Sequence, residues 1–269
     1  MRQAFTLVEL AIVLVIIGLL VGGVLTGADL IKSAQLYALN RDKVDVVTAA
    51  MTFRDKYGRM PGDWMHATDT FGILAGTGAD ATCQNTPTPA GSIATCNGNG
   101  NDHIDTSVVS GDEMFRFYQQ LGAAGLIKGN YTGTSGTNSS YTNGDVATVN
   151  MPETHRAGTV MFVGYSTGFA GNASLFAYSS GHVMYFIYAP PATGATLNSY
   201  IFTPSDDSRL DAKFDDGFPG TGLLVSNKGD GTANFCTNKA GTAPPGDAGA
   251  IYNLSDGNID CNMTYLRVF

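Results

Sequence analysis

The sequence predicts an α+β protein in which a long N-terminal α-helix packs against a globular head that contains one antiparallel β-sheet. Two observations carry this prediction. An apolar stretch spans 5–28 near the start of the chain, and strand-like runs rich in Val, Phe, Tyr and Ile follow beyond residue 150. At 269 residues the chain is long enough for one domain of ordinary core size or two small ones. We expect a single head over 58–269.

Composition excludes several classes of protein. The chain has 15 Lys and Arg against 23 Asp and Glu, a formal net charge of −8. No nucleic-acid partner is therefore expected, because binding a phosphate backbone needs a basic surface. The hydrophobic content of 43% is too high for a disordered chain. A mean hydropathy near zero excludes a polytopic membrane protein but allows one concentrated apolar segment.

The N-terminal stretch is such a segment. Residues from Leu10 to Ala28 carry no charge, and the longer stretch from Phe5 holds one, Glu9. A bilayer core of about 30 Å needs about 20 helical residues, so the segment is long enough to span. A signal anchor or an uncleaved secretory signal would explain the hydrophobicity but not Glu9, because acidic groups in membrane helices are costly and usually functional.

The position of Glu9 relative to Phe5 matches the N-terminal signal of a known protein family. Residues 4–10 read Ala-Phe-Thr-Leu-Val-Glu-Leu and resemble the class III signal of type IV pilins and type II secretion pseudopilins. In that family a prepilin peptidase cuts before a Phe and methylates the new amino group, and a Glu stands fifth in the mature chain. The resemblance implies a leader at 1–4, cleavage between Ala4 and Phe5, and Glu9 at the fifth position. The family usually has Gly before the cut, where this chain has Ala4.

The resemblance implies a function as well as a processing site. In the lipid-like centre of a filament, the Glu9 carboxylate of one subunit would pair with the Phe5 amine of a neighbour, so that neither charge is buried alone. The expected protein is a structural subunit of a type IV pilus or pilus-like extracellular filament and not an enzyme. A type II secretion pseudopilin and a minor pilin for adhesion or DNA uptake remain alternatives.

Partners and location are also carried over from the family. The implied partners are identical subunits in a helical filament, the prepilin peptidase, and an inner-membrane assembly platform with its ATPase. The subunit would wait in the bacterial inner membrane, anchored by one transmembrane segment over 5–28, before entering an extracellular or periplasmic filament.

The helix is expected to continue beyond the membrane to Tyr57. Apolar residues keep a spacing of three or four from Leu30 to Met51, except that Arg41 fills one position of the pattern, and charged residues lie on the opposite faces. A helix over 5–57 would be about 80 Å long at 1.5 Å per residue. Gly58 and the pair Pro61-Gly62 are expected to end it.

The head reads as a series of short elements. The stretches 72–102 and 130–146 are rich in Gly, Thr, Asn and Ser and are expected to be loops. Capping patterns predict helices from Ser110 to about Ile127 and from Thr203 toward Lys213. Strands are expected at 158–164, 174–179, 183–189 and 222–226.

Four cysteines, Cys83, Cys96, Cys236 and Cys261, should be oxidised in an exported head. The most local pairing joins Cys83 to Cys96 and Cys236 to Cys261, although four cysteines permit three connectivities. The resemblance favours the second pair, since pilins commonly close a C-terminal loop with a disulfide. A zinc site is the alternative, but the chain has no CxxC and its histidines are scattered.

The strongest metal candidate is the Asn- and Gly-rich segment 97–105. Its side-chain oxygens at alternating positions are similar to those of a calcium-binding loop and belong to Asn97, Asn99, Asn101 and Asp105. Asp112 or Glu113 would complete the coordination shell, and some heads of the family that the chain resembles bind calcium. The alternative is a series of tight Asn-Gly turns that needs no ion. No cofactor is required.

One motif points to a different class of function. Residues 164–168, Gly-Tyr-Ser-Thr-Gly, match the GxSxG nucleophile elbow, so a membrane-tethered hydrolase using Ser166 is a further alternative. The elbow requires a strand before the serine and a helix after it. An apolar strand precedes the motif, but the following residues show no helical period, and a hairpin turn explains the glycines better.

Overall fold

The computed structural model describes residues 6–74, 88–106, 113–134, 147–167, 179–189, 200–227, 236–238 and 249–269. Its dominant element is the helix α1 (Leu7–Tyr57), which begins at the N-cap Thr6. The helix ends where the sequence predicts, at Gly58, which has a φ of 78° and donates its N–H to the carbonyl of Arg54. The leader and Phe5 lie outside the described residues.

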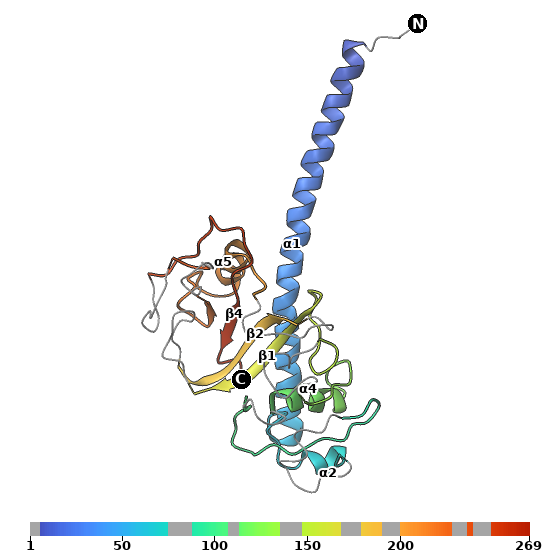
Figure 1. Ribbon diagram of the computed structural model, residues 1–269, viewed down its shortest axis with the longest axis vertical. Coiled ribbons are helices and arrows are strands. Elements are labelled where there is room, and N and C mark those ends of the chain that lie inside the picture. Colours follow the sequence, from blue (N-terminus) through green and yellow to red (C-terminus); the bar gives the residue numbers. More distant parts are fainter. Residues whose placement is uncertain are drawn as a thin grey trace.

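The two halves of α1 have different surroundings. The N-terminal half projects away from the head (Figure 1), and its large apolar side chains from Leu7 to Ile31 are exposed. The C-terminal half packs on the head and buries side chains between Leu36 and Phe53. A helix that is apolar around its whole circumference has no solvent-facing side, which explains why the first half needs an environment other than water.

The head contains one four-stranded sheet, in which all neighbours are antiparallel and the order is β1-β2-β4-β3. This arrangement confirms the predicted α+β class. The register pairs Thr159 with Tyr188 and Ser166 with Gly181. The strands are β1 (Thr159–Ser166), β2 (Gly181–Tyr188), β3 (Leu224–Ser226) and β4 (Met263–Leu266).

Three of the four predicted strands correspond to β1, β2 and β3. The predicted strand 174–179 falls almost entirely outside the described residues. Sequence analysis missed β4, which pairs with both β2 and β3 and therefore joins the two halves of the sheet. Its four residues are too few to show an alternating pattern.

Among the described residues, three shorter helices accompany the sheet: α2 (Ala67–Phe71), α4 (Glu113–Ala123) and α5 (Pro204–Phe214). The start of α5 is as predicted, with Thr203 as N-cap and Pro204 in the first turn. The predicted end of α4 near Ile127 is wrong: it ends at Ala123, and Gly125 then turns the chain at a φ of 70°. The predicted start of α4 at Ser110 lies outside the described residues.

The core lies between the C-terminal half of α1, α4 and the sheet. Phe53, Phe117 and Phe186 are completely buried in it. The hydroxyl of Tyr118 on α4 donates to the carbonyl of Met161 on β1 at 2.7 Å, which fixes the helix to the sheet. This packing holds the start of α4 beside the segment 97–105.

Candidate functional sites: the N-terminal helix and two carboxylate clusters of the head

The N-terminal half of α1 is the first candidate site. Within the described ranges, α1 is the helix that is long and apolar enough to cross a membrane, and none of its most apolar window is buried by the head. Its surface from Leu7 to Ile31 is mainly aliphatic. Between Leu7 and Ala28 the acidic residue is Glu9. The segment can therefore interact with lipid or with other apolar helices.

Glu9 is held at the start of α1 by a reciprocal capping box with Thr6. Its Oε2 accepts hydrogen bonds from the main-chain N–H and the hydroxyl of Thr6, both at 2.8 Å. The N–H of Glu9 donates to the Thr6 Oγ1 at 3.3 Å. Thr6 follows Phe5 directly, so the carboxylate lies next to the predicted processing point. Ala4 and Phe5 themselves lie outside the described residues, and their role stays a prediction.

The C-terminal disulfide is present as predicted, with Cys236 joined to Cys261 at a Cα–Cα distance of 5.1 Å. Both cysteines are buried. Cys96 is also disulfide-bonded, whereas Cys83 lies outside the described residues. Because the sulfurs of Cys236 and Cys261 are bonded to each other, they are not available as zinc thiolates.

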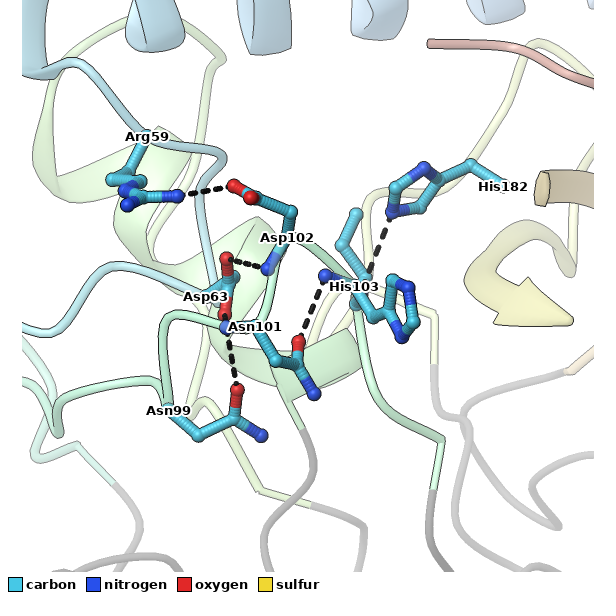
Figure 2. Close-up of polar contacts among 8 residues, drawn as sticks. Arg59, Asp63, Asn99, Asn101, Asp102, His103 and His182 are labelled. Carbon is cyan, nitrogen blue, oxygen red and sulfur yellow. Dashed lines mark hydrogen bonds and ion pairs between the residues drawn. The ribbon is translucent and has the colours of Figure 1, made fainter. Parts of the chain in front are cut away.

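The segment 97–105 wraps around two carboxylates from other parts of the chain. Asp63 accepts the main-chain N–H groups of Asn101 and Asp102, at 2.9 and 3.0 Å (Figure 2). Glu113, the first residue of α4, accepts those of Asn99 and Asp105, at 2.8 and 2.9 Å. The two buried carboxylates thus take up four main-chain donors of a segment without regular secondary structure.

Close main-chain packing explains a glycine in this segment. A Cβ on Gly98 would lie 2.2 Å from the carbonyl oxygen of Gly62 and 2.3 Å from the main-chain carbon of Asp63. The N–H of Gly98 also donates to the carbonyl of Trp64 at 3.0 Å. Only glycine allows the segment to approach the chain this closely.

The asparagine side chains face Asp105 with their N–H groups and not with oxygens. The Oδ1 of Asn99 accepts the N–H of Asn101, and the Oδ1 of Asn101 accepts the N–H of His103, at 2.9 and 2.8 Å (Figure 2). Their amide nitrogens therefore donate to the Oδ2 of Asp105, at 2.6 and 3.1 Å. Asn97 Oδ1 accepts the N–H of Thr68 at 2.9 Å, away from this group.

This donor set does not fit a calcium ion, which needs six to eight oxygens that converge on one point. The geometry agrees with the alternative of consecutive Asn-Gly turns. The calcium site at Asn97, Asn99, Asn101 and Asp105 stays a prediction that these contacts do not support.

Burial changes the acidity of the two organising carboxylates. It raises the pKa of Glu113 to about 7, against hydrogen bonds from Asp105 and Asn99 that lower it. Burial likewise raises the pKa of Asp63 above its ordinary range. The sequence indicates Glu113 only as a possible metal ligand. It gives no signal for Asp63, which is 38 and 39 positions away from its partners in the chain.

The serine of the GxSxG motif lies within β1, opposite Gly181 of β2. An elbow serine instead lies on the turn that follows its strand. The neighbouring Tyr165 stacks on His103 at a ring distance of 3.4 Å, and His182 accepts the N–H of Ile104 at 3.3 Å. Burial, with a smaller contribution from His103, lowers the pKa of His182 to about 4. These contacts do not assemble a nucleophile with a base; Gly168 lies outside the described residues.

A second carboxylate cluster lies on α5 and contains Asp207 and Asp211. Asp207 is fully buried, accepts the hydroxyl of Ser226 and lies 3.7 Å from the Sγ of Cys236. Asp211 accepts the hydroxyl of Tyr252 at 2.7 Å and the N–H of Gly217 at 3.1 Å. Burial raises the pKa of Asp207 to about 8 and that of Asp211 to about 6. The cluster ties α5 to β3 and to the segment closed by the disulfide.

Comparison with known proteins identifies the N-terminal segment. Residues 1–25 match a family model described as the prokaryotic N-terminal methylation motif, in agreement with the resemblance to type IV pilins and pseudopilins. A search of curated proteins found no match, and a search of solved structures also found none. The motif is typical of a pilin-like or pseudopilin substrate of a prepilin peptidase and points to a structural subunit.

Proposed function

We propose that this protein is a structural subunit of a type IV pilus or pilus-like extracellular filament, cleaved by a prepilin peptidase between Ala4 and Phe5. The observation that carries the proposal is the division of α1. Its first half is apolar, exposed and bears Glu9 in the register of the methylation motif, whereas its second half is built into the head.

In this proposal, helix–helix packing drives assembly. The aliphatic surface from Leu7 to Ile31 faces lipid in the inner membrane before assembly and neighbouring helices in the filament. Glu9 pairs with the Phe5 amine of a neighbour, and a misplaced subunit would leave both charges unpaired. The capping box supports this role, because it holds the carboxylate at the helix start beside the position of Phe5.

The remaining partners follow from this processing route. The prepilin peptidase creates the amine, and an assembly platform with its ATPase extracts the subunit from the membrane. The final filament is extracellular in a pilus and periplasmic in a secretion apparatus. A pseudopilin of a type II secretion system and a minor pilin have the same N-terminal features. Imaging native cells with an antibody to the subunit is therefore the experiment that distinguishes these alternatives from a major pilus subunit.

The test of the proposal combines processing with assembly. Mass spectrometry of the mature protein should find a methylated Phe5 at the N-terminus. An intact Met1 would contradict the proposal and indicate that the segment is a signal anchor. Glu9→Gln and Glu9→Leu should leave the protein folded and membrane-bound while filaments fall to background, because both remove the charge. Glu9→Leu also removes the side-chain acceptor of the two Thr6 hydrogen bonds, whereas Glu9→Gln keeps an acceptor there.

Asp29→Asn is the matched control, because it removes the next acidic group along α1 and should still give filaments. Normal filaments from Glu9→Gln would contradict the pairing of charges.

A further inference from the structure

The segment before β4 presents three large aliphatic side chains to solvent. Ile251, Leu254 and Ile259 are 55%, 63% and 51% exposed. We call 251–259 the apolar loop. Exposed aliphatic groups gathered on one segment often mark an interaction site.

The apolar loop is fixed in place. The N–H of Asn253 donates to the carbonyl of Cys236, and that of Asn238 donates to the carbonyl of Ile251, both at 3.0 Å. The disulfide to Cys261 closes the segment just beyond Ile259. These contacts fix the main chain of the apolar loop, whose three aliphatic side chains are exposed.

The apolar loop lies on the side of the head that faces the N-terminal half of α1. Lys32 of α1 pairs with Asp206 of α5 at 2.8 Å, and both line one cavity together with Ile259. Figure 1 shows α5 and the segment leading to β4 in the lobe beside the middle of α1, whereas α2 lies at the opposite end of the head. Ile259 therefore lies at about the level of Lys32 along the axis of α1.

That height can be compared with a bilayer. Lys32 follows Ala28, the last residue of the apolar stretch, by about 6 Å at 1.5 Å per residue. The polar headgroup layer adds roughly 5–8 Å on each side of a hydrocarbon core of about 30 Å. When α1 spans the membrane, Lys32, Asp206 and Ile259 are thus level with the headgroups.

We propose that the apolar loop docks on the surface of the membrane, with its aliphatic side chains inserted among the lipids, while the subunit waits for assembly. This inference rests on the proposed membrane-spanning state of α1. The partner is a lipid surface and not a second copy of the chain, because α1 of the same molecule already brings the loop to the bilayer at high effective concentration.

Charge indicates which lipids fit. Lys32 is paired with Asp206, Arg156 in the same cavity interacts with the same carboxylate, and Asp256 within the apolar loop is acidic. Insertion is therefore apolar and does not depend on anionic headgroups. The contact holds the head against the membrane and must break when the assembly machinery extracts the subunit.

The test uses variants of the full chain that carry one added tryptophan. Each variant is reconstituted in phosphatidylcholine vesicles whose brominated acyl chains quench indole fluorescence. Leu254→Trp reports on the loop, Leu14→Trp on the spanning segment, and Ile73→Trp, at a 64% exposed site beyond α2, on the far end of the head. The native Trp64 is 8% exposed and gives a constant background. The added emission should fall at least twofold for Leu254→Trp and Leu14→Trp and stay unchanged for Ile73→Trp.

Each of the other possible outcomes contradicts the docking inference. If Leu14→Trp is quenched while Leu254→Trp behaves like Ile73→Trp, the docking inference is overturned and the spanning helix stands. If Leu14→Trp is not quenched, the membrane-spanning state fails and the inference fails with it. If the emission of Leu254→Trp responds to protein density in the vesicle and not to bromine, the apolar loop contacts a second copy, and the lipid assignment is wrong.

Discussion

The buried carboxyl of Asp207 should make the head less stable as the pH rises, and Asp207→Asn should remove that effect. Asp207 has no exposed surface and lies between α5, β3 and the disulfide. Among the described residues its Oδ1 has no hydrogen-bond partner. Ionisation would therefore place a charge at a site that solvates it with little more than one hydroxyl, that of Ser226.

The magnitude follows from proton linkage. Burial raises the pKa of Asp207 from 3.8 to about 8. Between these values the unfolded chain is ionised while the folded chain holds the proton, so stability is lost as the pH rises, by about 1.4 kcal/mol per pH unit. From pH 5 to pH 7 the loss is about 3 kcal/mol. An Asn stays neutral at each pH and still accepts the Ser226 hydroxyl, so the stability of the variant relative to the wild type should rise by about 3 kcal/mol between pH 5 and pH 7.

Other groups also titrate in this range, which is why the comparison between variants is informative. Glu113 and Asp211, with pKa values raised to about 7 and about 6, act in the same direction as Asp207. His182 acts in the opposite direction, since a pKa lowered to about 4 makes the folded state gain stability as the pH rises toward 6.5. The contributions of Glu113 and His182 cancel in the difference between wild type and Asp207→Asn. Asp211 interacts electrostatically with Asp207, so its contribution cancels only in part.

The assay is guanidinium unfolding of the full chain in detergent, at pH 5, 6 and 7, followed by the fluorescence of Trp64. This side chain reports on the head because it packs against Tyr57 and Phe53, at ring distances of 4.7 and 5.8 Å. Asp55→Asn, which removes an exposed carboxylate of α1, should keep the wild-type pH slope. The same slope in wild type and Asp207→Asn would refute the assignment of a buried, protonated carboxyl.

Two further predictions concern the segment that Asp63 and Glu113 organise. Gly62→Ala should lower the free energy of unfolding by about 3 kcal/mol and Gly58→Ala by about 1 kcal/mol. Both glycines have a positive φ, which disfavours Ala at either position. The loss is larger at Gly62 because a Cβ there would lie 2.4 Å from the carbonyl oxygen of Glu113. Equal losses in chemical denaturation would contradict this reasoning. Millimolar calcium should leave the unfolding midpoint unchanged, because amide N–H groups face Asp105; a rise that Asp105→Asn abolishes would establish the calcium site instead.

Local signals explain which elements the sequence could predict. The end of α1 is marked by Gly58, and the start of α5 by Thr203 and Pro204, within a few residues of the boundary itself. The strands β1 and β2 are long enough to show their apolar character. The five residues of α2 and the four of β4 carry no such pattern, and their conformation depends on what they pack against.

The carboxylate clusters were not predictable for a related reason. Asp63 bonds to Asp102, and Asp211 bonds to Tyr252, across 39 and 41 positions of the chain. An acid that serves a distant loop looks, in sequence, the same as an acid on the surface. Asn97, Asn99 and Asn101 show the converse limit: their spacing indicates oxygens at regular intervals but not the amide orientation, which their main-chain partners determine.

These contacts also account for part of the acidic composition. Most of the described part of the head lies outside helices and strands. The N–H groups of such segments, once buried away from water, need acceptors that a neighbouring strand does not supply. Asp63, Glu113 and Asp211 supply them, accepting main-chain N–H groups from segments without regular structure. Because burial raises the pKa of each, the same residues that order the loops set a pH dependence on the head. The head should therefore be most stable on the acidic side of neutrality.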